Sequence, residues 1–141
     1  MKPAIASAVL ILLAACHGQQ PDSVNEQLAS TSQRQLADAE ALQEEYLDCI
    51  KDLGQKTAME SYTDKNTRQV VVLESCSDMA TRFTVVLEQG YDNACRAEDK
   101  AQSACDSEAV RKAKVDTDRL MLQARELINR TSASRRNHQT Q

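Results

Sequence analysis

Hydrophobic residues recur at steps of three and four positions in three stretches of the chain, the spacing that places side chains on one face of an α-helix. The first stretch predicts a helix over residues 28–53. A capping-box pattern, SVNE at residues 23–26, precedes it, and Gly54 is expected to end it in the left-handed conformation that glycine favours. The apolar face of this helix consists of Ala39, Leu42, Tyr46, Cys49 and Leu53, with Leu36, Leu47 and Ile50 beside it.

The second stretch predicts a helix over residues 67–90, after another capping-box pattern at residues 57–60. Its runs VVVL and TVVL are rich in β-branched residues, so a pair of β-strands is the alternative. We favour the helix because its apolar face holds over about four turns and no hairpin-turn dipeptide separates the runs. Gly90 and the pair Asp92-Asn93 are expected to end or bend it. The apolar face consists of Leu73, Cys76, Ala80, Phe83 and Leu87.

The third stretch predicts a helix that begins near Cys105 or Asp106. Only three glycines and two prolines occur in 141 residues, a composition that favours long helices. Short polar links join the three amphipathic stretches, so the predicted fold is all-α: a small antiparallel three-helix bundle over residues 28–130. The apolar face of the third helix consists of Val110, Ala113, Thr117, Leu120, Ala124 and Leu127.

The two ends of the chain differ from this helical domain. Residues 1–15 combine one positive charge with an apolar segment too short to span a membrane, which predicts a secretory signal peptide. Residues 131–141 are basic and lack large apolar side chains, which predicts a disordered basic tail.

The residues Leu13-Ala14-Ala15-Cys16 resemble the lipobox of bacterial lipoproteins. The resemblance implies cleavage before Cys16 and lipidation of its sulfur and new amino group. Residues 16–27 would then form a lipid anchor and flexible tether, and the domain would face the periplasm. His17 stands where an aspartate would imply inner-membrane retention, so the outer membrane is the expected address.

Four cysteines remain once Cys16 is set aside, and export to an oxidising compartment predicts that they form two disulfides. Their separations are too long for a structural zinc site, so no metal is expected. Cys95 and Cys105 flank the second turn, where antiparallel helices meet. Cys49 and Cys76 each lie on a core face, and their pairing requires a break in the chain between residues 61 and 67.

Catalytic chemistry is not expected from this sequence. Its only histidines, His17 and His138, lie outside the predicted helices, and its isolated glycines form no phosphate-binding loop. We therefore predict neither an enzyme nor a bound cofactor. The net charge of −4 argues against nucleic acid as a partner.

Exposed carboxylates on the first helix provide a candidate surface for a basic partner protein. Tyrosines near the turns add candidate interface anchors, although acidic helix faces are commonly only solvated and such tyrosines often only cover loops. These candidate partner-binding residues are Glu44, Glu45, Asp48, Asp52, Tyr62 and Tyr91.

The combined features predict a lipid-anchored, protein-binding module that serves a secretion, conjugation or pilus machine of the envelope. The alternative is an inhibitor or immunity protein that blocks a cell-wall-active or membrane-active enzyme. A small envelope hydrolase that uses the carboxylates of the first helix is a third hypothesis.

Overall fold

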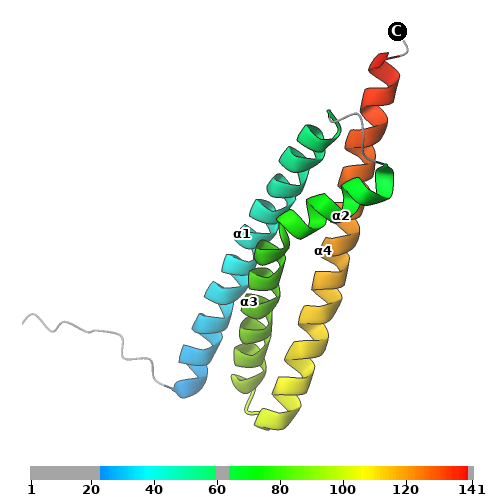
Figure 1. Ribbon diagram of the computed structural model, residues 1–141. Coiled ribbons are helices and arrows are strands. Elements are labelled where there is room, and N and C mark those ends of the chain that lie inside the picture. Colours follow the sequence, from blue (N-terminus) through cyan, green and yellow to red (C-terminus); the bar gives the residue numbers. More distant parts are fainter. Residues whose placement is uncertain (1–22, 60–63, 140–141) are drawn as a thin grey trace, which may run out of the picture.

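The computed structural model describes residues 23–59 and 64–139, with side chains described as far as Thr131. Its four helices are α1 (Val24–Thr57), α2 (Lys65–Ser75), α3 (Ser77–Arg96) and α4 (Gln102–Gln139) (Figure 1). No β-strand occurs in these two ranges. The all-helical prediction is confirmed, and the alternative of paired strands over residues 67–90 is wrong.

The three long helices α1, α3 and α4 lie side by side, with α3 between the other two in Figure 1. The short helix α2 crosses near the end of the molecule at which α1 finishes. The prediction of three helices is therefore corrected to four, because the predicted second helix is interrupted at Cys76. Cys76 has φ −105° and ψ 7°, outside the helical region, and this break lets α2 bury Val72 instead of continuing the line of α3.

The ends of α1 differ from their predicted positions. Ser23 caps the helix as predicted, since its Oγ accepts the N–H of Glu26 at 3.2 Å, and α1 begins inside the segment predicted as a tether. Gly54 does not end α1: no described glycine has a positive φ, and the helix continues to Thr57. Thr57 Oγ1 donates to the carbonyl of Leu53 at 2.8 Å, so Thr57 does not cap the next helix.

Asp64 caps α2, although the capping-box pattern in the sequence lies at residues 57–60. Its carboxylate accepts the N–H groups of Asn66 at 2.8 Å and Thr67 at 3.1 Å. A hydrogen bond from the Thr67 hydroxyl, together with these two from backbone N–H groups, lowers the pKa of Asp64. The turn-rich residues before Asp64 are thus followed by a well-defined helix start.

Gly90 was expected to end or bend its helix, but α3 continues through it and through Asp92-Asn93 to Arg96. Gly90 is buried, and a Cβ atom at this position would lie 2.9 Å from Cδ2 of Leu36. The glycine therefore serves the close approach of α3 to α1 rather than a turn.

The core contains most of the residues predicted for the three apolar faces. Tyr46 is fully buried, and its hydroxyl donates to Sδ of Met121 at 3.3 Å; burial raises its pKa. Val110 is an exception, because it is 54% exposed while its neighbour Ala109 is buried. The largest fully buried side chains are Tyr46, Ile50, Leu120, Ile128, Val72, Cys76 and Cys105.

Helix α4 is longer at both ends than predicted. It begins at Gln102, and its backbone remains helical to Gln139, through most of the predicted disordered tail of residues 131–141. Residues 131–139 contain no glycine or proline, so nothing in them forces the helix to stop. The turn before α4 contains Asp99, whose φ is 58° and whose Oδ1 accepts from Nδ2 of Asn25 at 2.8 Å.

Two cysteine pairs lie at disulfide distance, and they are the two pairs predicted. The Cα atoms of Cys49 and Cys76 are 6.2 Å apart, and those of Cys95 and Cys105 are 5.4 Å apart. The first pair joins α1 to the break between α2 and α3, and the second closes the turn between α3 and α4.

The predicted signal peptide, the lipobox and Cys16 lie outside the described residues. Among the residues that are described, no helix is both long enough and apolar enough to cross a membrane.

Candidate partner-binding surface

Five carboxylates line the solvent side of α1 between Arg34 and Lys51, a stretch that contains no lysine or arginine. All five residues are exposed. Within the described part of the chain, none of them forms an ion pair. We call these residues the acidic strip: Asp38, Glu40, Glu44, Glu45 and Asp48.

The acidic strip includes three of the predicted partner-binding residues, Glu44, Glu45 and Asp48. The fourth carboxylate, Asp52, is exposed but differs from them, because Nζ of Lys56 lies 2.6 Å from its Oδ2. Spacings of three and four residues place Glu44 next to Glu40, and Asp48 next to both Glu44 and Glu45, where like charges repel.

The position of the acidic strip follows from the helical period. The core face of α1 uses Ala39, Leu42, Tyr46 and Ile50, all buried, so the positions on the opposite side of the helix face solvent. A long, exposed and unpaired run of negative charge can attract a cationic surface, and its effect is strongest at low ionic strength.

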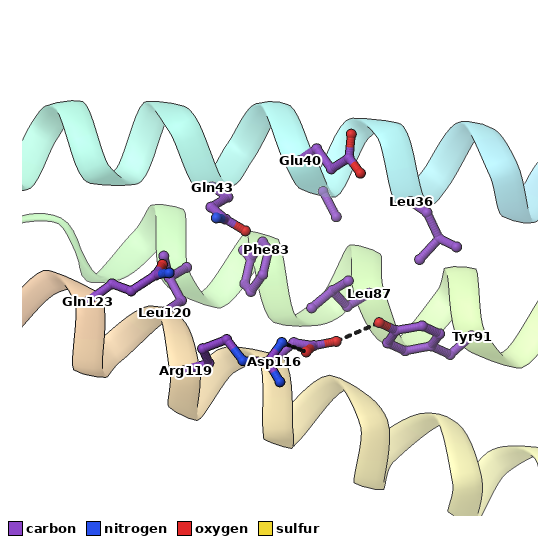
Figure 2. A pocket seen from close by; sticks show the side chains of 11 residues that line it. Leu36, Glu40, Gln43, Phe83, Leu87, Tyr91, Asp116, Arg119, Leu120 and Gln123 are labelled. Carbon is purple, nitrogen blue, oxygen red and sulfur yellow. Dashed lines mark hydrogen bonds and ion pairs between the residues drawn. The ribbon is translucent and has the colours of Figure 1, made fainter.

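A groove of about 300 Å³ lies beside the acidic strip, between α1 and α4, with α3 beneath it (Figure 2). Its apolar lining comes from all three helices. Polar side chains from α1 and α4 form its edges, and Glu40 belongs both to the groove and to the acidic strip. The groove is lined by Leu36, Ala39, Glu40, Gln43, Phe83, Leu87, Tyr91, Asp116, Arg119, Leu120 and Gln123.

Tyr91 lies at one end of the groove, where its hydroxyl donates to Oδ2 of Asp116 (Figure 2). Asp116 also pairs with Arg119, whose Nη1 lies 2.9 Å from Oδ1. Nζ of Lys112 lies 5.6 Å from the centre of the Tyr91 ring, a cation–π distance. Desolvation, the hydrogen bond to Asp116 and the negative charge of Asp116 raise the pKa of Tyr91 to about 12.

The predicted partner-binding residues are therefore not one cluster. The carboxylates lie on the outer face of α1, Tyr91 lies half-buried in the groove, and Tyr62 lies outside the described residues. Sequence reasoning missed Gln43, Arg119 and Gln123 because the pairing of α1 with α4 is not visible in one helical period. The absence of cations between residues 34 and 51 is visible in the sequence and marks the whole strip.

Within residues 23–59 and 64–131, no group of three or more histidine, cysteine, aspartate or glutamate side chains could hold a metal ion. The cysteines there are paired with each other. The exposed groups of this surface support salt-bridge formation along α1 and apolar contact in the groove. Comparison with known protein families, curated proteins and solved structures finds no match for this chain.

Proposed function

We propose that this chain is a lipid-anchored, periplasm-facing protein-binding module, and that its acidic strip receives a basic surface of the partner. The observation that carries the proposal is the set of five exposed carboxylates on α1 without an ion pair in the described residues. Neighbouring like charges destabilise a helix, so an opposite charge supplied by a partner would relieve a cost already present in the free protein.

The framework suits a binding surface that must hold its shape. In the proposal, α1, α3 and α4 act as a rigid antiparallel bundle, with α2 as a cross-piece and one disulfide at each end of α3. Because α1 is one continuous helix of 34 residues, or about 50 Å, the strip presents its charges in a constant order.

The proposed anchor places the acidic strip relative to the membrane. Lipid on Cys16 would hold the start of α1 close to the outer membrane, since only residues 17–22 separate Cys16 from the cap residue Ser23. The strip would then lie in the middle of a helix that leads away from the membrane. That position suits an accessory of a secretion, conjugation or pilus machine, and an inhibitor of a basic envelope enzyme would use the same surface.

The binding proposal is tested by photo-crosslinking in living cells. A photoreactive amino acid replaces Glu44 in one variant and Asp118 in a matched control, since Asp118 is an exposed carboxylate of α4 that pairs with Lys114 at 2.8 Å. We expect an adduct with a basic protein from position 44 and not from position 118. Its yield should fall when Glu45 and Asp48 are replaced by Gln and Asn, and equal yields from both positions would contradict the proposal.

The anchor is tested separately. Cys16→Ser should abolish incorporation of labelled palmitate and release the protein from the membrane fraction. Retention of both label and membrane association in this variant would overturn the assignment of Cys16.

A further inference from the structure

We propose that the groove between α1 and α4 receives a large apolar side chain of the same partner, so that the recognised element combines one aromatic residue with adjacent Lys or Arg. This inference rests on the proposed function and adds the chemistry of the ligand. It joins two features that share Glu40: the acidic strip and the groove.

The size and lining of the groove suit a single large side chain. Its volume of about 300 Å³ is at the lower end of the range for ligand pockets. Phe83 and Leu87 of α3 supply the apolar surface beneath it, and Leu36 and Leu120 supply the walls (Figure 2). Phe83, Leu87 and Leu120 are at most 5% exposed, so the accessible apolar surface comes from the half-buried Leu36 and Tyr91. Covering that surface with an apolar side chain removes it from water and favours binding.

The edges of the groove offer polar groups that no described side chain or backbone group occupies. Gln43 on α1 and Gln123 on α4 have no hydrogen-bond partner in the described residues, and each can both donate to and accept from a peptide backbone. Glu40 forms no ion pair with another described side chain. The groove therefore combines an apolar interior with free amides at its edges.

The charges at the edges select a cation. Arg119 is occupied by Asp116 at 2.9 Å, so this pair contributes little net charge. Glu40 contributes an unpaired negative charge, and Glu44 adds a second one helical turn further along α1. A partner that places an aromatic residue in the groove would therefore bind best if an adjacent Lys or Arg of that partner faced Glu40 and Glu44 on α1.

The predicted tether and the C-terminal segment lack the side chain that this occupant requires. Residues 17–22 (HGQQPD) and 132–141 (SASRRNHQTQ) contain no large apolar side chain. A partner with an aromatic and basic element meets the requirement, whereas the chain's own tether and C-terminal segment do not.

The groove is tested with tryptophanamide, a small cation that carries an indole ring, and with N-acetyltryptophan, its anionic counterpart. The protein contains no tryptophan, so indole fluorescence reports the probe alone. We expect tryptophanamide to bind with a Kd of about 1 mM, the order of magnitude for so small a ligand, and N-acetyltryptophan to bind at least about threefold more weakly. Methyl NMR should show shifts at Leu36, Leu87 and Leu120 and none at the exposed Val70 and Val71 of α2.

A matched pair of variants separates the groove from general charge effects. Glu40→Gln should weaken tryptophanamide binding about threefold, as expected for one exposed ion pair, because Glu40 lines the groove. Glu74→Gln makes the same change in charge at an exposed position of α2, outside both the groove and the acidic strip, and should leave the Kd unchanged. Equal effects of the two substitutions would overturn the charge assignment, and absence of shifts at the three leucines would overturn the groove assignment.

Two further measurements keep this inference distinct from the proposed function. Trilysine has no apolar side chain and probes the acidic strip alone; if it fails to bind while tryptophanamide binds, the strip proposal fails and the groove stands. Shifts at the groove leucines that depend on protein concentration without any probe would show that a second copy is the occupant, which would contradict this inference.

Discussion

Helices α1 and α4 hold their carboxylates in very different settings. The five on α1 between Arg34 and Lys51 have no ion pair in the described residues, whereas all five on α4 pair with lysine or arginine. The paired residues of α4 are Asp106, Glu108, Asp116, Asp118 and Glu126.

The difference lies in the positions of the cations. Lys112 and Lys114 lie four residues from Glu108 and Asp118, the spacing at which opposite charges stabilise a helix by about 0.2–0.5 kcal/mol for each pair. On α1, that spacing joins Glu40 with Glu44 and Glu44 with Asp48, which costs a similar amount. The stability of α1 must therefore come from its buried face, where Tyr46 and Ile50 are 0% exposed. A helix held by its core can carry an unpaired surface for another use.

The largest effect concerns the disulfides that hold each helix in place. Replacing Cys49 and Cys76 by Ala should lower the free energy of unfolding by about 3.5 kcal/mol, and replacing Cys95 and Cys105 by about 2.7 kcal/mol, because the closed loops span 27 and 10 residues. Urea denaturation of the two double variants measures the difference. The reverse order would show that loop length does not govern their contributions.

A smaller effect concerns the approach of α3 to α1. Gly90→Ala should destabilise the fold by about 1 kcal/mol, because its Cβ would lie 2.9 Å from Leu36 and the overpacking exceeds the gain in helix propensity. Gly54→Ala is the control between α1 and α4, since its Cβ would meet only Oγ1 of Thr131 at 3.3 Å. Thermal unfolding should give Gly90→Ala a lower Tm than Gly54→Ala. A Gly90→Ala variant that is more stable than the unmodified protein would contradict the role of Gly90 in the close approach of α3 to α1.

The hydrogen bond between Tyr91 and Asp116 tests the α4 side of the groove. Tyr91→Phe should cost about 1 kcal/mol. The folded chain holds the phenolic proton more tightly than the unfolded chain, since the pKa of Tyr91 is about 12 rather than 10.0. The contribution of protonated Tyr91 to the free energy of unfolding is complete below pH 10 and is lost as the pH rises towards about 12.

Asp116→Asn should lower the pKa of Tyr91, because it removes the negative charge that disfavours tyrosinate. NMR titration of the tyrosine Cζ resonances measures this value. An unchanged pKa in Asp116→Asn would assign the whole shift to desolvation.

The smallest effects test the charge comparison directly. Glu44→Gln combined with Asp48→Asn should raise the free energy of unfolding by a few tenths of a kcal/mol, because it removes repulsion along α1. Lys114→Gln should lower it by a similar amount, because Asp118 loses its partner. Both changes should shrink at high salt, and chemical denaturation at two ionic strengths measures them. If both variants changed the free energy of unfolding in the same direction, the contrast between unpaired charges on α1 and paired charges on α4 would be wrong.

Much of the architecture was predictable because hydrophobic spacing and cysteine position are local properties. The three apolar faces, the cap at Ser23 and both cysteine pairs follow from the sequence. The break at Cys76 does not, because the apolar spacing of Leu73, Cys76 and Ala80 continues across it. Only the tertiary contacts of α2 decide that the chain turns there.

The remaining errors have the same origin. Gly90 looked like a helix stop, although its role depends on Leu36, more than fifty residues away. Val110 and Ala109 are adjacent on one helix, and the packing of α4 decides which of them is buried. The acidic strip was visible in part from the sequence, whereas the groove needs three helices and was not.

The connectivity of the disulfides has a consequence for biogenesis. The first cysteine of the domain pairs with the second, and the third pairs with the fourth. Under the proposed export, the chain enters the oxidising compartment from its N-terminus, so each of these four cysteines meets its native partner before another of the four can compete. Oxidation in order of emergence then produces the native bonds directly, without a step that reshuffles wrong ones.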